Sequence, residues 1–522
     1  MQLHELDACA LKDALARRET SSVEIVRALI SRRRDVDGRL GAFIARMDQQ
    51  ALELAESADS ERKAAGTPEN LPLLHGLPMT VKDNIEVAGT DATLGVLSRV
   101  GRASEKDALV VSELRRAGAI ILGKTNVPQL LLVQETDNAI FGVTRNPWNS
   151  SRTPGGSSGG EAAALASGQT PLGIGSDIGG SMRIPAHFTG ICALKPTVDR
   201  WSVRGLLGAF EGQEIVRSQL GPMARSVRDL WLLMRAVSPE RQSQQDPAVA
   251  PLPIGEPVSL RGLRIGYFID DGFVTPTASI VRAVRQAADA LRAAGATLVE
   301  YQPPAASDLL YLWLAAMTAD GGQTLLRLLA GEPICKQLKL ANLMARMPAP
   351  VRAAAAALLE KKGERGLAGM LRAAGEKCVS EYWQIAAQRT AIRRSEFDAW
   401  NTRSLDAVLC PPHVLPALPI GSSGDLTLTL SYMFRYVLLN FPAGIVPVTR
   451  VREDETDWTG PRGMFGGKCA DALRGSAGLP VGVQVVSRPY REDVALSIMA
   501  VIEEAARGQR DYPRTPIEPI AG

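Results

Sequence analysis

Gly155-Gly156-Ser157-Ser158-Gly159-Gly160 and Asp177-Ile178-Gly179-Gly180-Ser181 are the two stretches of this sequence that decide its fold. They are turns within the region 73–208, where glycine-rich turns alternate with short β-rich or apolar runs and with helical segments. This alternation is typical of α/β layering around a largely buried sheet. The expected strands lie at 79–81, 119–122 and 171–174, and the expected helices at 107–117 and 160–167. The sequence therefore predicts an α/β fold.

The rest of the chain carries further secondary-structure signals. Apolar residues at helical spacing over 6–34, with a cap signal at 20–24, predict two helices at the start. Residues 238–260, rich in Pro, Gln and Ser, indicate a surface connection, after which 263–268 restarts a strand. Two later ranges are interpreted as further strands and turns: 411–449 and 479–486.

Composition excludes several classes of partner. The chain has 522 residues, of which 45% are hydrophobic and 22% charged, as in an ordinary soluble globular protein. Its 59 Lys and Arg residues nearly balance 56 Asp and Glu residues, and no basic run with interleaved aromatics occurs, so we expect no nucleic-acid partner. The start of the chain lacks a secretion signal, and no window reaches the about 18 apolar residues of a membrane span.

The cysteines indicate a reducing compartment. They show neither Cys-x-x-Cys nor Cys/His metal spacing, so we interpret them as reduced, mostly buried thiols. We therefore expect a cytoplasmic protein without a metal or another cofactor. The six cysteines are Cys9, Cys192, Cys335, Cys378, Cys410 and Cys469.

Lys82 is the candidate general base. A serine hydroxyl is a poor nucleophile at neutral pH, so a neighbour must take its proton. Lys82 ends an apolar run, Gly76-Leu77-Pro78-Met79-Thr80-Val81-Lys82, that would bury its amine. Because burial lowers the pKa of a lysine, the neutral amine could accept that proton. The histidines, the usual alternative, lie in no local pattern with a serine: His4, His75, His187 and His413.

The two serine tracts have different interpretations. The tract at 155–160 matches Gly-x-Ser-x-Gly, but that nucleophile elbow needs a strand directly before Ser157, and 146–154 is a polar loop with two prolines. We interpret this tract as a loop whose amides and hydroxyls converge on one point, with a structural turn as the alternative. At 177–181, consecutive glycines let successive N–H groups face one concavity suited to an oxyanion, with the nucleophile Ser181 at its edge.

One further motif is a false match. Residues 118–125 satisfy Gly-x4-Gly-Lys-Thr, the pattern of a phosphate-binding loop. In such a loop the variable residues follow a strand and precede a helix. Here 119–122 is itself the strand, and Asn126-Val127-Pro128 stands where the helix should begin. We therefore expect no nucleotide binding.

The segment 333–372 differs from the rest of the chain in composition, because apolar and basic residues are mixed along it. One interpretation is a solvent-facing helical hairpin with an ordinary core-facing stripe. The other is an interfacial helix pair that docks on a membrane. The sequence leaves both interpretations open.

Taken in order and spacing, these motifs closely resemble the amidase signature family. The resemblance is carried by the Lys82 tract, 117–126, 146–148, 154–160 and 175–197, and it extends through 221–225, 441–444 and 478–484 over nearly the whole chain. It implies a single large α/β/α domain over 1–522, with a mixed, mostly buried central β-sheet covered by helices. The segment 333–372 would be a helical cap-like part of that domain.

Within the family the nearest resemblance is to the fatty acid amide hydrolases, judging from 141–148, 159–162, 188–192 and 333–372. In those enzymes the last segment is a membrane-docking cap. Two features differ from that pattern. The N-terminal transmembrane helix of the mammalian enzyme has no counterpart in this sequence, and the helix from Val351 carries five alanines where bulky apolar residues are expected.

Carried over to this chain, the resemblance implies a Ser-Ser-Lys triad. Ser181 would attack the amide carbonyl, Ser157 would relay its proton while held in a cis peptide, and neutral Lys82 would be the ultimate base. An ion pair between Asp177 and Arg183 would support the site. The oxyanion would be stabilised by four backbone amides, those of Ile178, Gly179, Gly180 and Ser181.

The predicted substrate is a small-molecule amide with a sizeable apolar part. By position, Leu131, Leu132 and Gln134 are candidates for the acyl channel, with ordinary core packing as the alternative. Carbamate or ester hydrolysis by the same triad is a second function. A third, from another class, is a non-catalytic protein of an assembly or the amidotransferase component that passes ammonia to a charged tRNA. Peripheral membrane contact through 333–372 and a homodimer are the partner interactions that we consider.

Overall fold

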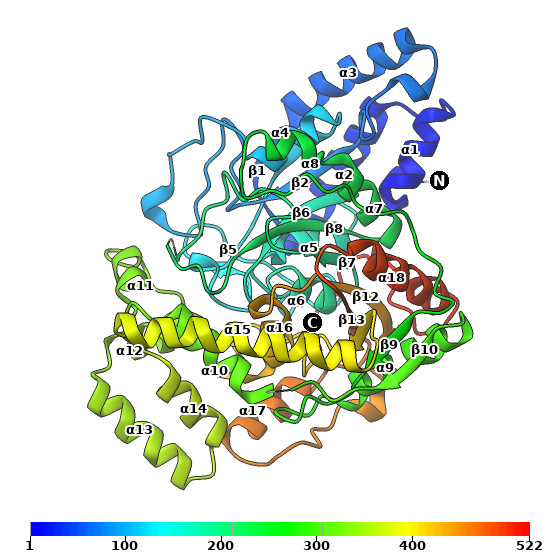
Figure 1. Cartoon of the computed structure of the whole chain (residues 1–522). Helices are drawn as coiled ribbons and strands as arrows, with labels where there is room; N and C mark the ends of the chain where they lie inside the picture. The colour runs from blue at the N-terminus through cyan, green and yellow to red at the C-terminus, as the bar shows by residue number, and fades with distance from the viewer. Residues whose placement is uncertain (1, 211, 305) are drawn as a thin grey trace.

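A single 11-stranded β-sheet forms the centre of the computed structural model, which describes residues 2–210, 212–304 and 306–522 (Figure 1). Its strand order is β1-β3-β2-β6-β8-β7-β12-β13-β11-β9-β10. Four neighbouring pairs are parallel (β3 with β2, β2 with β6, β11 with β9, and β9 with β10), and the other pairs are antiparallel. The sheet is therefore mixed, and the predicted α/β class is confirmed.

The strands of this sheet are β1 (Phe43–Arg46), β2 (Pro78–Lys82), β3 (Ile120–Thr125), β6 (Leu172–Asp177), β7 (Cys192–Lys195), β8 (Gln219–Ala224), β9 (Arg264–Tyr267), β10 (Thr297–Glu300), β11 (Ala407–Cys410), β12 (Ala443–Arg450) and β13 (Pro480–Ser487). A separate two-stranded ribbon consists of β4 (Asp137–Asn138) and β5 (Gly142–Val143).

The helices are α1 (Ala8–Ala16), α2 (Ser22–Leu40), α3 (Asp48–Ala65), α4 (Leu109–Arg116), α5 (Gly159–Ala166), α6 (Arg183–Thr189), α7 (Val227–Ala236), α8 (Pro239–Ser243), α9 (Ala278–Ala293), α10 (Ala306–Met317), α11 (Gln323–Leu328), α12 (Lys339–Arg346), α13 (Ala349–Lys361), α14 (Arg365–Ala373), α15 (Val379–Thr402), α16 (Ser431–Leu438), α17 (Met464–Leu473) and α18 (Glu492–Arg507). Short 3-10 turns are η1 (Leu3–Glu5), η2 (Pro68–Asn70), η3 (Leu97–Arg99), η4 (Gln129–Leu131), η5 (Lys336–Leu338), η6 (Ser423–Leu430) and η7 (Glu453–Glu455).

Both faces of the central sheet are covered. Every residue of β2, β3, β6, β8 and β13 is buried, although successive side chains of a strand point to opposite faces. Helices α5, α6, α7, α9 and α18 pack against these central strands. Because neither face meets water, the strands are apolar runs rather than alternating ones, and a charged side chain within them is exceptional.

Most predicted elements lie where the sequence places them. The two initial helices are α1 and α2, and Ser21 caps α2 in a capping box with Glu24. The predicted strands correspond to β2, β3, β6, β9 and β13, and the predicted helices to α4 and α5. Residues 238–260 begin with α8 and continue as a mostly exposed connection, as expected.

The interpretation of 411–449 as strands and turns is wrong in part. The range ends in β12, but it also contains η6 and the helix α16. All eight residues of α16, from Ser431 to Leu438, are buried. Half of the residues of this helix are Tyr, Phe or Val, which favour strands, so its local composition favours the wrong element.

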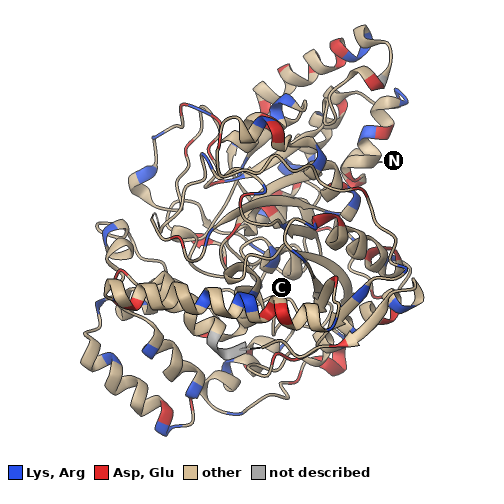
Figure 2. Ribbon diagram, viewed as in Figure 1, with Lys and Arg blue, Asp and Glu red and all other residues tan. Residues whose placement is uncertain are grey.

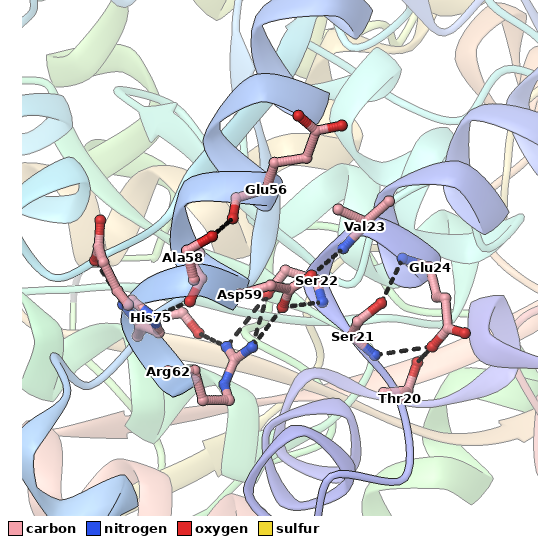
Figure 3. A network of polar contacts seen from close by, with 12 residues as sticks. Thr20, Ser21, Ser22, Val23, Glu24, Glu56, Ala58, Asp59, Arg62 and His75 are labelled. Carbon is pink, nitrogen blue, oxygen red and sulfur yellow. Dashed lines mark hydrogen bonds and ion pairs between the residues drawn. The ribbon is translucent and has the colours of Figure 1, made fainter. Parts of the chain in front are cut away.

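A polar network joins α2 and α3 to the chain that enters β2 (Figure 3). The Asp59 carboxylate accepts from the amides of Ser22 and Val23 at the start of α2, and Arg62 donates to Asp59 at 2.6 Å. Arg62 also donates to the carbonyl of His75 at 3.1 Å. Since Gly76 follows His75 and β2 begins two residues later, this network helps to anchor the strand that carries Lys82.

The segment 333–372 is helical, but it contains η5 and three α-helices rather than the expected pair. Helices α12, α13 and α14 lie at the opposite end of the molecule from α1 and α3 (Figure 1). Leu343 and Leu358 on these helices are each 56% exposed. Acidic and basic residues are spread over all parts of the ribbon (Figure 2). No helix in the described ranges is both long and apolar enough to cross a membrane.

Candidate active site

Lys82 lies at the end of β2 and is fully buried. Its Nζ is 2.7 Å from Ser157 Oγ, 2.9 Å from Ser176 Oγ and 3.2 Å from the Ser176 carbonyl oxygen. Neither serine carries a charge, and no carboxylate is hydrogen-bonded to this amine within the described residues. The amine therefore sits among neutral oxygens.

This environment favours the neutral amine. Burial lowers the pKa of Lys82 to about 7, against the opposing charges of Asp177, Asp83 and Glu161. An amine with two N–H donors and one lone pair can donate to the Ser176 carbonyl and hydroxyl and still accept from the Ser157 hydroxyl. The Lys82 amine thus combines a lowered pKa with a position within hydrogen-bond distance of the Ser157 hydroxyl.

Ser157 occupies the loop between β5 and α5 and is 1% exposed. The Gly156–Ser157 peptide bond is cis, as the family resemblance implies. The amide of the next residue, Ser158, donates to the carbonyl oxygen of Ser181 at 2.9 Å, so this loop lies directly against the second serine tract. The structure therefore brings together Lys82, Ser157 and Ser181, which are far apart in sequence.

Ser181 differs from the other two residues because it borders a cavity of about 250 Å³. Gly156 borders the same cavity, whereas Lys82 and Ser157 are not part of its lining. The Ser181 hydroxyl is not hydrogen-bonded to any residue that the structure describes. Catalytic hydrogen bonds often tighten only when substrate binds, so this geometry is compatible with a relay from Ser181 through Ser157. A molecule in the cavity would meet Ser181 first.

The tract before Ser181 forms a tight turn around a buried carboxylate. Asp177 and Arg183 are both fully buried, with Arg183 Nε 3.0 Å from Asp177 Oδ2, so the predicted ion pair is present. Burial would raise the pKa of Asp177, but the charge and hydrogen bonds of Arg183 outweigh it and leave that pKa below its usual value. Arg183 also donates to Gln484 at 2.7 Å, which ties the turn to β13.

Three of the four amides proposed for the oxyanion remain available. The Gly180 N–H donates to Asp177 Oδ1 at 2.8 Å, whereas the N–H groups of Ile178, Gly179 and Ser181 have no acceptor within the described residues. Glycine is needed at 180 because φ is +106° there and an added Cβ would lie 2.8 Å from Met433. The turn is thus held open toward the cavity by Asp177.

The cavity wall contains residues that the sequence predicted and others that it did not. All three predicted channel residues, Leu131, Leu132 and Gln134, line it. Trp313 and Phe434 also line it, and the sequence did not predict them. Their rings stack with centroids 4.1 Å apart, and the Trp313 indole N–H donates to the Ile178 carbonyl at 3.1 Å. Further apolar lining comes from Phe210, Met317, Leu325, Leu338, Leu340, Met344 and Met370. Several of these belong to the segment 333–372, which therefore forms part of the cavity wall.

Ser181, Ile178 and Gly179 line one part of the cavity, and Lys82 contacts Ser157 next to them, outside the lining. Among the described residues, no group of three or more His, Cys, Asp or Glu side chains could hold a metal ion. The site therefore combines a serine on a cavity with a buried lysine amine whose pKa is lowered.

Comparison with known proteins gives the family. The amidase family model matches residues 24–496, so this chain belongs to the amidase family and is an amide hydrolase. Fatty-acid amide hydrolase 1 of Sus scrofa is 38% identical over 454 residues, covering 85% of this chain and 78% of that protein. A glutamyl-tRNA(Gln) amidotransferase component of Roseiflexus sp. (strain RS-1) is 30% identical and covers 99% of each chain. A solved fatty acid amide hydrolase structure superposes with a TM-score of 0.84 and 26% identity, covering 97% of this chain and 85% of that one.

Proposed function

We propose that this enzyme cleaves a carboxylic amide through an acyl-serine on Ser181, with Ser157 as the proton relay and Lys82 as the base. The observation that supports the proposal most is the 2.7 Å contact between Lys82 Nζ and Ser157 Oγ, directly behind the cavity that Ser181 borders. Two serines are required because a hydroxyl can donate and accept at once, and so bridges nucleophile and amine.

The proposed reaction has two halves. As Ser181 Oγ bonds to the carbonyl carbon, its proton passes to Ser157 and the Ser157 proton passes to Lys82, while the carbonyl electron pair moves onto oxygen beside the 178–181 amides. The C–N bond then breaks, and the proton returns from Lys82 through Ser157 to the leaving nitrogen. Water attacks the acyl-serine with the same relay and releases the acid.

The rate of amide hydrolysis is expected to follow the titration of Lys82. Only the neutral amine accepts a proton, and its pKa is about 7, so kcat/KM should fall about tenfold per pH unit below pH 7 and level off above about pH 8. The measurement is kcat/KM from about pH 5 to 10 with a slow amide substrate, for which chemistry limits the rate. A profile that is flat from the acid end upward would argue for a carboxylate base instead.

The acyl group is proposed to be long and apolar. Leu131, Leu132, Trp313 and Met344 are among the many apolar residues around the cavity, and burying each methylene contributes about 0.8 kcal/mol. In a panel of amides of one amine, kcat/KM should therefore rise by at least about tenfold from a two-carbon to an eight-carbon acyl group. Aryl anilides, carbamates and esters in the same panel test the second function. A preference for the shortest acyl group would contradict the apolar assignment.

The similarity to an amidotransferase component makes that role the third candidate function. In that function the chain would act only with partner proteins and a charged tRNA, whereas the apolar cavity beside Ser181 favours a small apolar amide. Hydrolysis by the purified single chain supports the proposal, and an absolute requirement for co-purifying partners would reverse it.

The proposal also includes where the enzyme acts in the cell. The exposed Leu343, Val351 and Leu358 lie on helices that also carry Lys339 and Arg352, which supports peripheral membrane contact through 333–372 for a cytoplasmic enzyme. Sedimentation with anionic lipid vesicles distinguishes this from a solvent-facing hairpin, and analytical ultracentrifugation tests the expected homodimer.

A further inference from the structure

A second buried ionisable group lies beside the triad, and the reaction described above does not use it. Glu161, in the first turn of α5, is fully buried. Thr125 Oγ1 donates to Glu161 Oε2 at 2.7 Å, and Thr80 Oγ1 donates to Glu161 Oε1. Both oxygens of this carboxyl group are thus held by hydroxyls from two adjacent parallel strands, β2 and β3.

The strand geometry places Glu161 in the same layer as Lys82. Thr80 and Lys82 are two residues apart on β2, so their side chains point to the same face. Helix α5 packs against this strand. Gly173 on β6 is the direct partner of Thr80 in the sheet, and a Cβ at this glycine would clash with Glu161 Oε1. The missing side chain at 173 provides the space that the carboxyl group occupies.

Three carboxyl groups act on the charge of Lys82, and two of them are already compensated. Asp177 is paired with Arg183, and Asp83 accepts from the amides of Thr93 and Leu94. Glu161 forms no ion pair within the described residues, and Lys82 is the one cation found to act on it. The other ionisable groups on elements packed against α5 have their own partners: Lys124 donates to the Asp91 carbonyl, and His187 accepts from the Gly482 amide.

Glu161 is not hydrogen-bonded to Lys82, so it acts on the amine through its charge. Burial raises the pKa of Glu161, and the hydrogen bonds from Thr80 and Thr125 oppose this by stabilising the carboxylate. A carboxylate near a buried amine favours the ammonium form, so ionised Glu161 works against the desolvation that neutralises Lys82. The two threonines therefore help to determine what fraction of Glu161 is ionised, and hence how strongly it opposes the neutral form of Lys82.

We propose that Glu161 is a positioning residue that sets the pH range in which Lys82 is neutral, and that Thr80 and Thr125 hold its carboxylate for this purpose. The inference rests on the proposed role of Lys82 as the base. It predicts that removing the charge of Glu161 while keeping its shape shifts the whole activity profile toward acid.

The test compares the pH dependence of kcat/KM for wild type, Glu161→Gln and Thr125→Val. In Glu161→Gln the midpoint of the rising limb should move to lower pH by about half a unit or more. Thr125→Val removes one hydroxyl that stabilises the carboxylate, so the midpoint should move in the same direction by a smaller amount. This variant also provides the test if Glu161→Gln does not fold. Glu503→Gln is the matched control, because this buried glutamate pairs with Arg507 and does not face Lys82. Its midpoint should stay at the wild-type value.

Two outcomes would overturn the inference: a lower rate with an unmoved midpoint in both variants, which indicates a structural brace, or a shift toward alkaline pH. The same profiles are recorded for covalent labelling of Ser181 by a fluorophosphonate, which needs no amide substrate. If wild type labels but cleaves no amide, the proposed function fails while the labelling midpoints still decide the role of Glu161.

Discussion

Replacing Ser181 with alanine is expected to lower kcat/KM for amide hydrolysis by about 10⁵-fold or more, because the covalent route disappears with the nucleophile. Ser181 is the member of the proposed triad that borders the cavity, whereas Ser157 is not part of the cavity lining. The variant should also lose covalent labelling by a fluorophosphonate. The hydroxyl makes no hydrogen bond within the described residues, so little change in thermal stability is expected.

The matched control for this substitution is Ser279→Ala, at a fully buried serine near the start of α9 and outside the cavity lining. It should label and cleave like wild type. Undiminished labelling of Ser181→Ala would place the nucleophile elsewhere, and peptide mapping of the labelled protein would show where.

Replacing Lys82 with alanine is expected to lower kcat/KM for amides by about 10³- to 10⁴-fold, the usual contribution of a general acid–base group. The loss has two parts, because in the proposed reaction the amine accepts the proton of Ser181 through Ser157 and later returns it to the leaving nitrogen. The substitution removes a buried amine whose side-chain hydrogen bonds are to two uncharged serines, so it breaks no hydrogen-bonded ion pair. The measurement is kcat/KM at about pH 8, where the wild-type amine is mostly neutral.

Lys124→Met is the matched control for the loss of a buried lysine. Lys124 lies on the adjacent strand β3, and burial lowers its pKa to about 8, but its amine donates to the Asp91 carbonyl rather than to either serine. This variant should keep amidase activity within about tenfold of wild type. An equal loss of activity in both variants would show that removing any buried lysine from this sheet has this effect, and that proton transfer by Lys82 does not explain it.

Local chemistry explains why much of the fold, and the three residues that the structure brings together at the site, could be predicted. The capping box at Ser21 and Glu24 and the apolar run that ends at Lys82 are signals contained in a few consecutive residues. The glycines of the 177–181 turn likewise indicate a tight backbone directly. Lys82, Ser157 and Ser181 come from three such local motifs, and the family resemblance implies the roles that we propose for them.

The parts of the fold and of the site that the sequence did not predict depend on contacts between residues far apart in the chain. Trp313 and Phe434 form one wall of the cavity, but they lie 121 positions apart (434 minus 313), and neither has a local motif around it. Phe434 belongs to α16, the buried helix in which half of the residues are Tyr, Phe or Val, types that favour strands. Glu161 follows the glycine tract and looks like an ordinary polar residue at a helix start. Only the packed structure shows that α5 buries it between two threonines.

The role of Lys82 in proton transfer is best measured with an amide and an ester of the same acyl group, cleaved by wild type and Lys82→Ala under identical conditions. An alkoxide or phenolate leaves without prior protonation more readily than an amine, so we predict that the variant loses at least about 100-fold more amidase than esterase activity. Equal survival of both activities, or the absence of any cleavage by wild type, would contradict this role.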